Sequence, residues 1–168
     1  YGHSKLMFEQ ILDWYGTIHG LVSVRLRYFN AAGATVQFGE HHRIETHLIP
    51  NVLKVALGQA PHVNIFGTEH PTPDGTCIRD YIHVLDLSQA HAQALNATKT
   101  GAYNIGTGEG YSVRQVIDLA REVTGREIPV VESPARPGDP PVLVAAADRL
   151  RRELGWKPEY PTLRPILE

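Results

Sequence analysis

The first residues of the chain pair a phenol with an amine. Tyr1 and Lys5 stand four positions apart at the start of a segment with helical periodicity, which places both side chains on one face of a helix. A phenol is a poor acid or base at neutral pH because its ordinary pKa is about 10. A cation beside it favours the phenolate and lowers that pKa. The pair could therefore transfer protons, although this spacing also occurs by chance in many helices without a catalytic role.

A helix expected over residues 5–18 must hold this pair in place. Two apolar stripes run along it at helical spacing, one formed by Met7, Ile11, Trp14 and Ile18 and the other by Phe8, Leu12 and Tyr15. A helix that is apolar on two sides is expected to pack against two partners. Gly20 is expected to end it, because glycine commonly stands just past a helix C-terminus.

Strands and helices alternate along the rest of the chain. Strands are expected over residues 22–28, 63–66, 78–84, 102–105 and 128–131, and helices over residues 49–57, 87–97 and 147–154. A further helix is expected after Ser112, which forms a capping box with Gln115. Loops are expected over residues 30–33, 68–76 and 134–141. This mixture predicts an α/β fold.

Composition and charge are those of an ordinary globular domain. The 168 residues suffice for one domain with its own core, and 42% apolar with 20% charged residues is a typical balance. The net charge of −2 lacks the basic excess of nucleic-acid-binding domains, so no nucleic-acid partner is expected. No apolar run approaches the roughly 18 residues of a membrane span, and no signal peptide is recognised, so no membrane partner is expected.

The cysteine and the histidines suggest neither a disulfide framework nor a metal centre. Cys77 is the single cysteine, and we expect it to be a small buried residue in a reducing, cytoplasmic compartment. Nine histidines are present, and His41, His42 and His47 stand close together. No His-Glu-x-x-His pattern or Cys/His cluster accompanies them, so no metal site is expected.

Five motifs together carry a resemblance to a known family. They are Tyr-Gly-His-Ser-Lys-Leu with Glu9, Arg-Tyr-Phe-Asn-Ala-Ala-Gly-Ala at 27–34, Asp-Gly-Thr-Cys-Ile-Arg-Asp-Tyr-Ile-His-Val at 74–84, Tyr-Asn-Ile-Gly-Thr-Gly at 103–108, and Arg-Pro-Gly-Asp at 136–139. In this order and spacing, they resemble the UDP-glucose 4-epimerase branch of the extended short-chain dehydrogenases. The resemblance covers essentially the whole chain. It implies the C-terminal part of a Rossmann-type enzyme with a smaller α/β substrate-binding domain.

The same resemblance implies a division of the chain and a missing portion. Residues 1–30 would complete the NAD-binding Rossmann domain, and residues 31–168 would form mainly the UDP-sugar-binding domain, with some segments returning to the Rossmann sheet. Family members carry a Gly-rich phosphate loop before the catalytic tyrosine, and this chain opens at that tyrosine. Residues 106–108 begin like such a loop, but Tyr111 stands at the third glycine position, so a turn is expected there. The chain alone is therefore expected to be inactive.

The activity implied for the complete enzyme is the NAD-dependent interconversion of UDP-glucose and UDP-galactose through a 4-keto intermediate. Tyr1 would be the proton-transfer residue, and Lys5 would lower its pKa and hold the nicotinamide ribose. Tyr28 and Phe29 would lie near the nicotinamide. The helix that carries Tyr1 and Lys5 would contribute to a homodimer interface.

The resemblance also implies a set of substrate-binding residues: Asn30, His47, Leu48, Asn64, Ile65, Phe66, Arg79, Arg136, Asp139 and Leu143. Arg79 and Arg136 would clamp the diphosphate through paired N–H donors, and Asp139 would accept from ribose hydroxyls. His47 stands where the family often has an Asn, and its ring N–H can donate as an amide does. Leu143 would line the sugar pocket, where a side chain smaller than Tyr leaves room for N-acetylated sugars.

Several alternatives remain at this point. The chain could belong to a nucleotide-sugar 4,6-dehydratase or decarboxylase, it could only bind a nucleotide sugar, or it could be one part of a two-chain assembly. Individual residues also have structural interpretations: Asn30 as a turn residue, the two arginines as a surface pair, and Asp80 with Tyr81 as structural support near Arg79.

Overall fold

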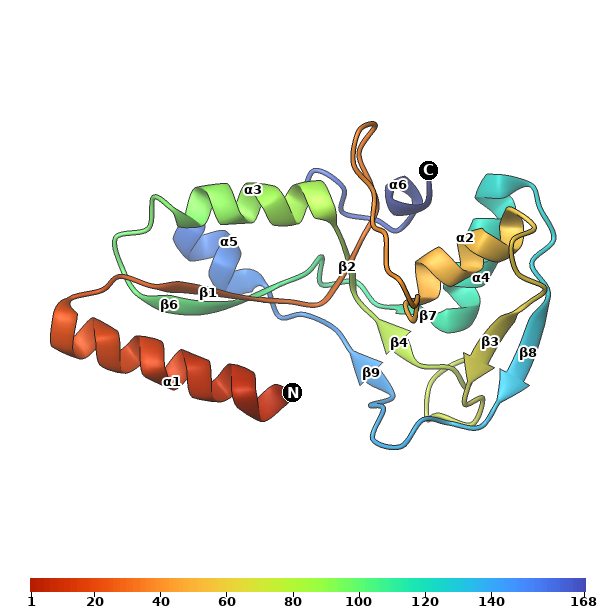
Figure 1. Cartoon of the computed structure of the whole chain (residues 1–168), viewed down its shortest axis with the longest axis horizontal. Coiled ribbons are helices and arrows are strands. Elements are labelled where there is room, and N and C mark those ends of the chain that lie inside the picture. The colour runs from red at the N-terminus through yellow and green to blue at the C-terminus, as the bar shows by residue number, and fades with distance from the viewer.

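The computed structural model describes residues 1–168 and arranges them in two lobes (Figure 1). The first lobe holds α1 (Gly2–His19), β1 (Val24–Tyr28), α3 (Val84–Ala94), β6 (Gly101–Ile105) and α5 (Asp148–Leu154). The second lobe holds α2 (Leu48–Ala56), β3 (Val63–Phe66), β4 (Ile78–Arg79), β7 (Tyr111–Ser112), α4 (Val113–Thr124), β8 (Val130–Ser133) and β9 (Val142–Leu143). Three elements remain: β2 (Asn30–Ala32), β5 (Tyr81–His83) and α6 (Arg164–Leu167).

The strands pair mainly in parallel, between segments far apart in the sequence. β1 pairs with β6, β2 with β5, and β3 with β8, each in parallel. β4 lies between β7, which is antiparallel to it, and β9, which is parallel. Parallel pairs need crossover connections, and helices such as α3 and α4 supply them. The α/β class predicted from the sequence is confirmed.

Each lobe has its own hydrophobic core. In the first lobe, Trp156 and Leu150 are fully buried against Ile105, Tyr103 and Ile82. In the second lobe the core is formed by buried residues of α2, β3, α4 and α6, together with Tyr81 and Ile128. The residues of the two cores alternate along the chain, so neither lobe is a continuous stretch of sequence. The assignment of residues 1–30 and 31–168 to two functional domains stays a prediction.

The strand expected over residues 78–84 is wrong in one respect, because it breaks at Asp80. Before the break, β4 pairs with β9, and after it β5 pairs with β2. At the break the Asp80 carbonyl accepts from the backbone N–H of Asn30 at 3.1 Å and from its side-chain amide at 3.0 Å. Asn30 thus begins β2, a strand where a loop was expected.

The Asp80 side chain explains the turn at residues 106–108. Asp80 is fully buried, and its carboxylate accepts from the amide and hydroxyl of Thr107 and from the amides of Gly108 and Ala145. Gly108 has a φ of 85°, which a glycine adopts without strain. The expected turn is confirmed. The structural role expected for Asp80 is to accept the hydrogen bonds that hold this turn in place.

Helix boundaries follow local capping. Gly20 has a φ of 68° and its N–H bonds back to Gly16, so it ends α1 as expected. The capping box of Ser112 and Gln115 is present at the start of α4. α3 begins three residues earlier than expected, because the ring of His83 accepts from the N–H of Leu85 and caps it.

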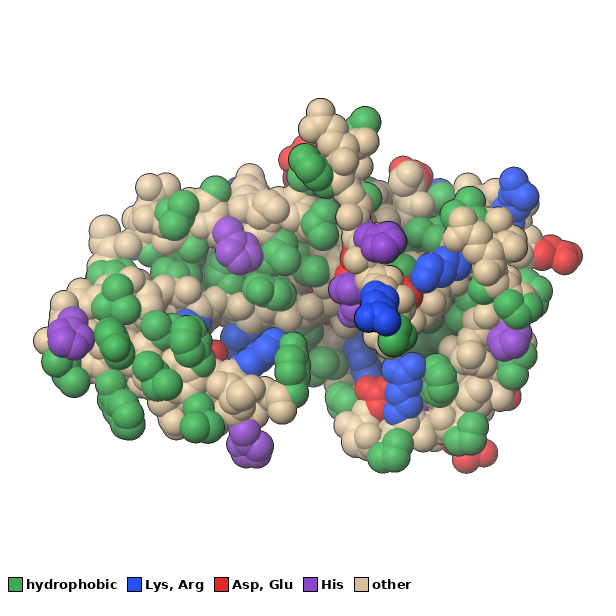
Figure 2. Space-filling view, viewed as in Figure 1, with side chains coloured by type: hydrophobic (Ala, Val, Ile, Leu, Met, Phe, Trp, Pro, Cys, Tyr) green, Lys and Arg blue, Asp and Glu red, His purple; other side chains and the backbone are tan.

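Helix α1 differs from the others, because none of its residues is buried. Polar contacts join it to β1: Arg25 bonds to the carboxylate of Asp13 at 2.6 Å, and Arg27 forms an ion pair with Glu9. Its apolar side chains are exposed and gather along its surface (Figure 2): Leu6, Met7, Phe8, Ile11, Trp14, Tyr15 and Ile18. The exposed apolar side chains of this helix thus have no packing partner within the single chain. None of the helices has the length and apolar character needed to cross a membrane.

Candidate functional site

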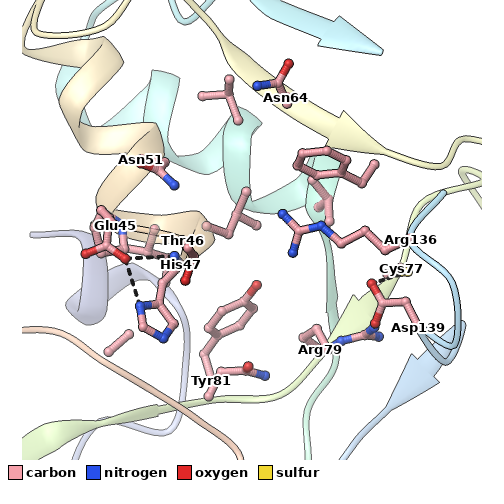
Figure 3. Close-up of a pocket in the computed structure, with 18 of the residues that line it drawn as sticks. Glu45, Thr46, His47, Asn51, Asn64, Cys77, Arg79, Tyr81, Arg136 and Asp139 are labelled. Carbon is pink, nitrogen blue, oxygen red and sulfur yellow. Dashed lines mark hydrogen bonds and ion pairs between the residues drawn. The ribbon is translucent and has the colours of Figure 1, made fainter. Parts of the chain in front are cut away.

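A cavity of about 540 Å³ opens beside the N-terminus of α2 (Figure 3). Its walls come from β2, α2, β3, β4 and the loop that follows β8. Many of the residues that the sequence assigned to substrate binding line it together: Asn30, His47, Leu48, Asn64, Phe66, Arg79, Arg136 and Asp139. Segments up to about a hundred positions apart in sequence therefore meet in one place.

Arg136 supplies a cation without a carboxylate partner. Its guanidinium lies over the ring of Phe66, 4.0 Å from the centroid, and points into the cavity in Figure 3. The ring holds the guanidinium by a cation–π interaction and leaves its N–H donors in the plane available. Arg136 takes part in no ion pair with any Asp or Glu of the chain. It is therefore ready to bind an anion.

Arg79 is engaged differently. It forms an ion pair with Asp139, and its Nη1 donates to the carbonyl of Ile78 at 2.7 Å. The second carboxylate oxygen of Asp139 lies 3.8 Å from the thiol of Cys77. Cys77 is 4% exposed, so it is the small buried residue that was expected, and this burial raises the pKa of its thiol. Arg79 and Asp139 line the cavity as a neutral pair.

The N-terminus of α2 presents free donors to the same cavity. His47 is the N-cap, with extended backbone angles, and its side chain makes no capping bond. The N–H groups of Leu48 and Ile49 have no hydrogen-bond partner, and Pro50 has no N–H. Free amides and the positive end of the helix dipole make such a position favourable for an anion.

Glu45 fixes the residue that begins this helix. Its carboxylate accepts from the backbone N–H of His47 at 2.7 Å, and lies 2.8 Å from Nδ1 of the same residue. Burial opposes the charge of Glu45, but these bonds outweigh it and hold the pKa of the carboxyl below its ordinary value. Sequence reasoning missed Glu45, since a single acidic residue two positions before a histidine carries no recognisable signal.

Other lining residues were also missed. They are Thr46, Asn51, His62, Cys77 and Tyr81. Asn51 stands one helical turn after His47, so helical spacing could have indicated it. Burial raises the pKa of Tyr81 to about 12, so its hydroxyl stays protonated in the cavity wall and can donate a hydrogen bond.

The expected catalytic pair lies outside the cavity. The ammonium of Lys5 stands over the ring of Tyr1, 4.3 Å from the centroid, and Tyr1 is 94% exposed. The end of α1 that carries Tyr1 is the end nearer to the second lobe in Figure 1. Tyr28 stands at the end of β1 beside the ring of His91, and the N–H of Phe29 donates to the carbonyl of Ile105. None of the four lines the cavity.

Two other expected site residues also lie apart from the cavity. The side chain of Ile65 is buried in the core of the second lobe, so only its backbone remains for the contact that was expected. Leu143 is 44% exposed on β9, where it pairs in register with Arg79. Leu143 therefore neighbours Arg79, which lines the cavity, but does not itself line it.

Comparison with known proteins gives consistent results. Residues 1–164 match the family described as GDP-mannose 4,6 dehydratase. The chain is 48% identical to the UDP-glucose 4-epimerase of Corynebacterium glutamicum over its whole length, which is 52% of that relative.

Solved structures agree. One UDP-glucose 4-epimerase structure superposes with a TM-score of 0.94 at 48% identity, covering 100% of this chain and 53% of the other. That from Bifidobacterium longum, in complex with NAD+ and UDP, gives 0.92 at 42% identity, covering 99% and 52%. The chain spans about half the length of the curated relatives it matches. These similarities confirm the resemblance that the five motifs indicated.

Proposed function

The chain belongs to the GDP-mannose 4,6-dehydratase family of extended short-chain dehydrogenases, and from this premise we propose that it is the UDP-sugar-binding part of a UDP-glucose 4-epimerase. In the complete enzyme the reaction is the interconversion of UDP-glucose and UDP-galactose at carbon 4. The proposal is supported by 48% identity to a UDP-glucose 4-epimerase and by the chemistry of the cavity. Residues 1–30 would belong to the NAD-binding domain, and residues 31–168 mainly to the sugar-nucleotide domain.

One observation carries this proposal. The guanidinium of Arg136, without an ion-pair partner, and the free amides of Leu48 and Ile49 line one cavity. A diphosphate carries negative charge on several oxygens and can accept from both groups at once. The other cation of the cavity, Arg79, is already paired with Asp139, so a diphosphate would compete with that carboxylate for its donors.

The remaining lining residues suit the rest of a uridine nucleotide. Phe66 offers an aromatic face beside the Arg136 guanidinium, and the side-chain amide of Asn64 can pair with a base edge. Asp139 can accept from ribose hydroxyls through the oxygen that faces Cys77. A nucleotide held in this way leaves the sugar free to turn over while the diphosphate stays bound.

The catalytic role falls to residues at the edge of the first lobe. The exposed Tyr1–Lys5 pair and the exposed ring of Tyr28, at the carboxyl end of β1, fit the nicotinamide end of NAD, since ligands bind at that end of parallel strands. When bound, NAD supplies a reversible hydride acceptor for sugar carbon 4. Tyr1 takes the proton of the 4-hydroxyl and returns it to the 4-keto oxygen. The charge of Lys5 favours the phenolate that this transfer requires.

A binding experiment tests the nucleotide site. Titration calorimetry with UDP should give one site on the chain, and Arg136→Gln should weaken binding by about tenfold or more, because a charged hydrogen-bond donor is lost. Arg126→Gln is the matched control, since Arg126 is exposed and forms no ion pair. Equal affinity in both variants would contradict the assignment of Arg136. In the complete enzyme, UDP-galactose turnover with NAD then separates an epimerase from a protein that only binds.

We also propose a homodimer through α1 and a cytoplasmic location. The exposed apolar side chains of α1 support an interface there, and the free thiol of Cys77 suits a reducing compartment. Sedimentation should show association that Trp14→Glu weakens. Leu57→Glu, an equally exposed apolar residue outside α1, should leave it unchanged. A wild-type chain that stays monomeric at high concentration argues against the interface.

A further inference from the structure

Four side chains of a short segment before α2 converge on one point. They are Glu40, His42, Glu45 and His47, and one ligand atom of each lies within 4.8 Å of the others. All four come from eight consecutive residues in the connection between β2 and α2, which contains no regular helix or strand. The sequence predicted no metal site, because it contains none of the familiar His and Cys patterns. The pattern here is Glu-x-His-x-x-Glu-x-His.

The distances suit a tetrahedral ion. Nδ1 of His42 lies 3.0 Å from Glu40 and 3.7 Å from Glu45, and Nδ1 of His47 lies 3.8 Å and 2.8 Å from the same two carboxylates. A tetrahedral zinc ion with bonds of about 2.0–2.1 Å separates its ligand atoms by roughly 3.3 Å. Two of the four nitrogen–oxygen distances are shorter than this value and two are longer. Small side-chain movements would therefore bring the four ligand atoms to the corners of a tetrahedron.

The charges of the cluster also call for a cation. The carboxylates of Glu40 and Glu45 contact the two histidine rings and form no ion pair with any Lys or Arg. The side chain of Glu45 is only 5% exposed, and the backbone N–H of His47 donates to its carboxylate. An oriented ligand of this kind, held by a second hydrogen bond, is typical of built metal sites.

We propose that Glu40, His42, Glu45 and His47 bind one zinc ion or a similar divalent transition-metal ion. Imidazole and carboxylate ligands suit zinc and cobalt, whereas magnesium and calcium prefer oxygen ligands alone. Four protein ligands close the coordination shell, so the ion is structural rather than catalytic. It ties the connection before α2 to His47, the residue that begins the helix.

Binding changes which nitrogen of each histidine carries the proton. In the metal-free protein, Nδ1 of His47 can donate its hydrogen to Glu45, whereas a metal ligand must offer a lone pair from that atom. The neutral ring then keeps its hydrogen on Nε2, which remains available as a donor. Metal binding and the nucleotide site are thus compatible.

The test compares two adjacent histidines. After treatment with a chelator, the chain is titrated with Zn²⁺ by calorimetry and with Co²⁺ by visible absorption. We expect one equivalent of each to bind, and the strong cobalt band of tetrahedral coordination. His42→Gln should weaken Zn²⁺ binding by about tenfold or more, whereas His41→Gln, next to it but outside the cluster, should not. Glu40→Gln provides a second variant if His42→Gln fails to fold.

Each outcome is decisive. No stoichiometric Zn²⁺ binding, equal effects of the His41 and His42 variants, or equal affinity for Mg²⁺ would overturn the proposal. UDP titration of the same proteins separates this inference from the proposed function, because neither His42 nor Glu40 lines the cavity. Normal UDP binding without Zn²⁺ binding would reject the metal site alone.

Discussion

Thr107 donates both its amide and its hydroxyl to a single carboxylate oxygen of Asp80, each at 2.9 Å. The other oxygen of Asp80 accepts from the amides of Gly108 and Ala145. Through these bonds one buried side chain joins β4, the turn after β6 and the segment after β9. Because β6 belongs to the first lobe and β4 and β9 belong to the second, the Asp80 carboxylate links the two lobes.

We predict that Asp80→Asn destabilises the chain by about 3 kcal/mol, because an amide group would face N–H donors in a fully buried position. Urea unfolding measures this loss. Asp118→Asn is the control, since Asp118 is exposed and its ion pair with Arg121 is a surface contact expected to contribute less than about 1 kcal/mol. Comparable losses in both variants would show that the buried network has no special importance.

A second prediction concerns His83 and pH. Burial lowers the pKa of His83, although Asp86 and Glu159 act in the opposite direction, and its ring stacks on Tyr160. Protonation of Nδ1 would also remove the acceptor that caps α3. The unfolded chain therefore binds this proton more readily than the folded chain, and stability falls as the pH drops below the ordinary histidine pKa of about 6.5.

The variant His83→Asn isolates this effect, because its oxygen can still cap the helix but does not titrate. Urea midpoints should fall less between about pH 7.5 and pH 5.5 in this variant than in the wild type. His3→Asn, at an exposed position, should keep the wild-type slope. An unchanged slope in His83→Asn would contradict the assignment.

The sequence predicted the local features well and the long-range ones poorly. The ends of α1 and α4 were predictable because Gly20, Ser112 and Gln115 act on neighbouring residues. The break at Asp80 was not, since it depends on Asn30, 50 positions away. β7 and β9 contain two residues each, too few to show any periodicity.

The candidate site shows the same division. Arg79, Arg136 and Asp139 were found because they stand in extended motifs. Glu40 and Glu45 were missed, because only the folded course of residues 40–47 brings their carboxylates to the histidine rings. Sequence spacing could not indicate that Arg79 is paired with Asp139 while Arg136 has no carboxylate partner.

The third prediction concerns proton transfer. In the complete enzyme, Tyr1→Phe should lower turnover by about a hundredfold or more and leave UDP affinity nearly unchanged. The reason is that Tyr1 lies outside the cavity that would hold the nucleotide. Steady-state kinetics with UDP-galactose and calorimetry with UDP measure the two effects. A loss that appears mainly as weaker UDP binding would show that Tyr1 has a different role.

The last prediction concerns the substrate range and Leu143. This residue pairs in register with Arg79, so both side chains lie on the same face of the sheet, and Leu143 is exposed beside the cavity rather than packed in a core. A sugar extending from the diphosphate toward Arg79 would pass this position. Leu is smaller than Tyr, so we expect the complete enzyme to accept UDP-N-acetylglucosamine as well as UDP-galactose.

The variant Leu143→Tyr tests whether volume at this position decides that range. It should keep activity on UDP-galactose and lose most activity on the N-acetylated sugar, because the acetamido group must fit in both orientations of the rotating ring. Val142→Tyr is the matched control, since Val142 is similarly exposed but alternation along β9 turns it to the opposite face. It should leave the ratio of the two activities unchanged. Equal loss of both activities in Leu143→Tyr would mean that Leu143 has only a structural role.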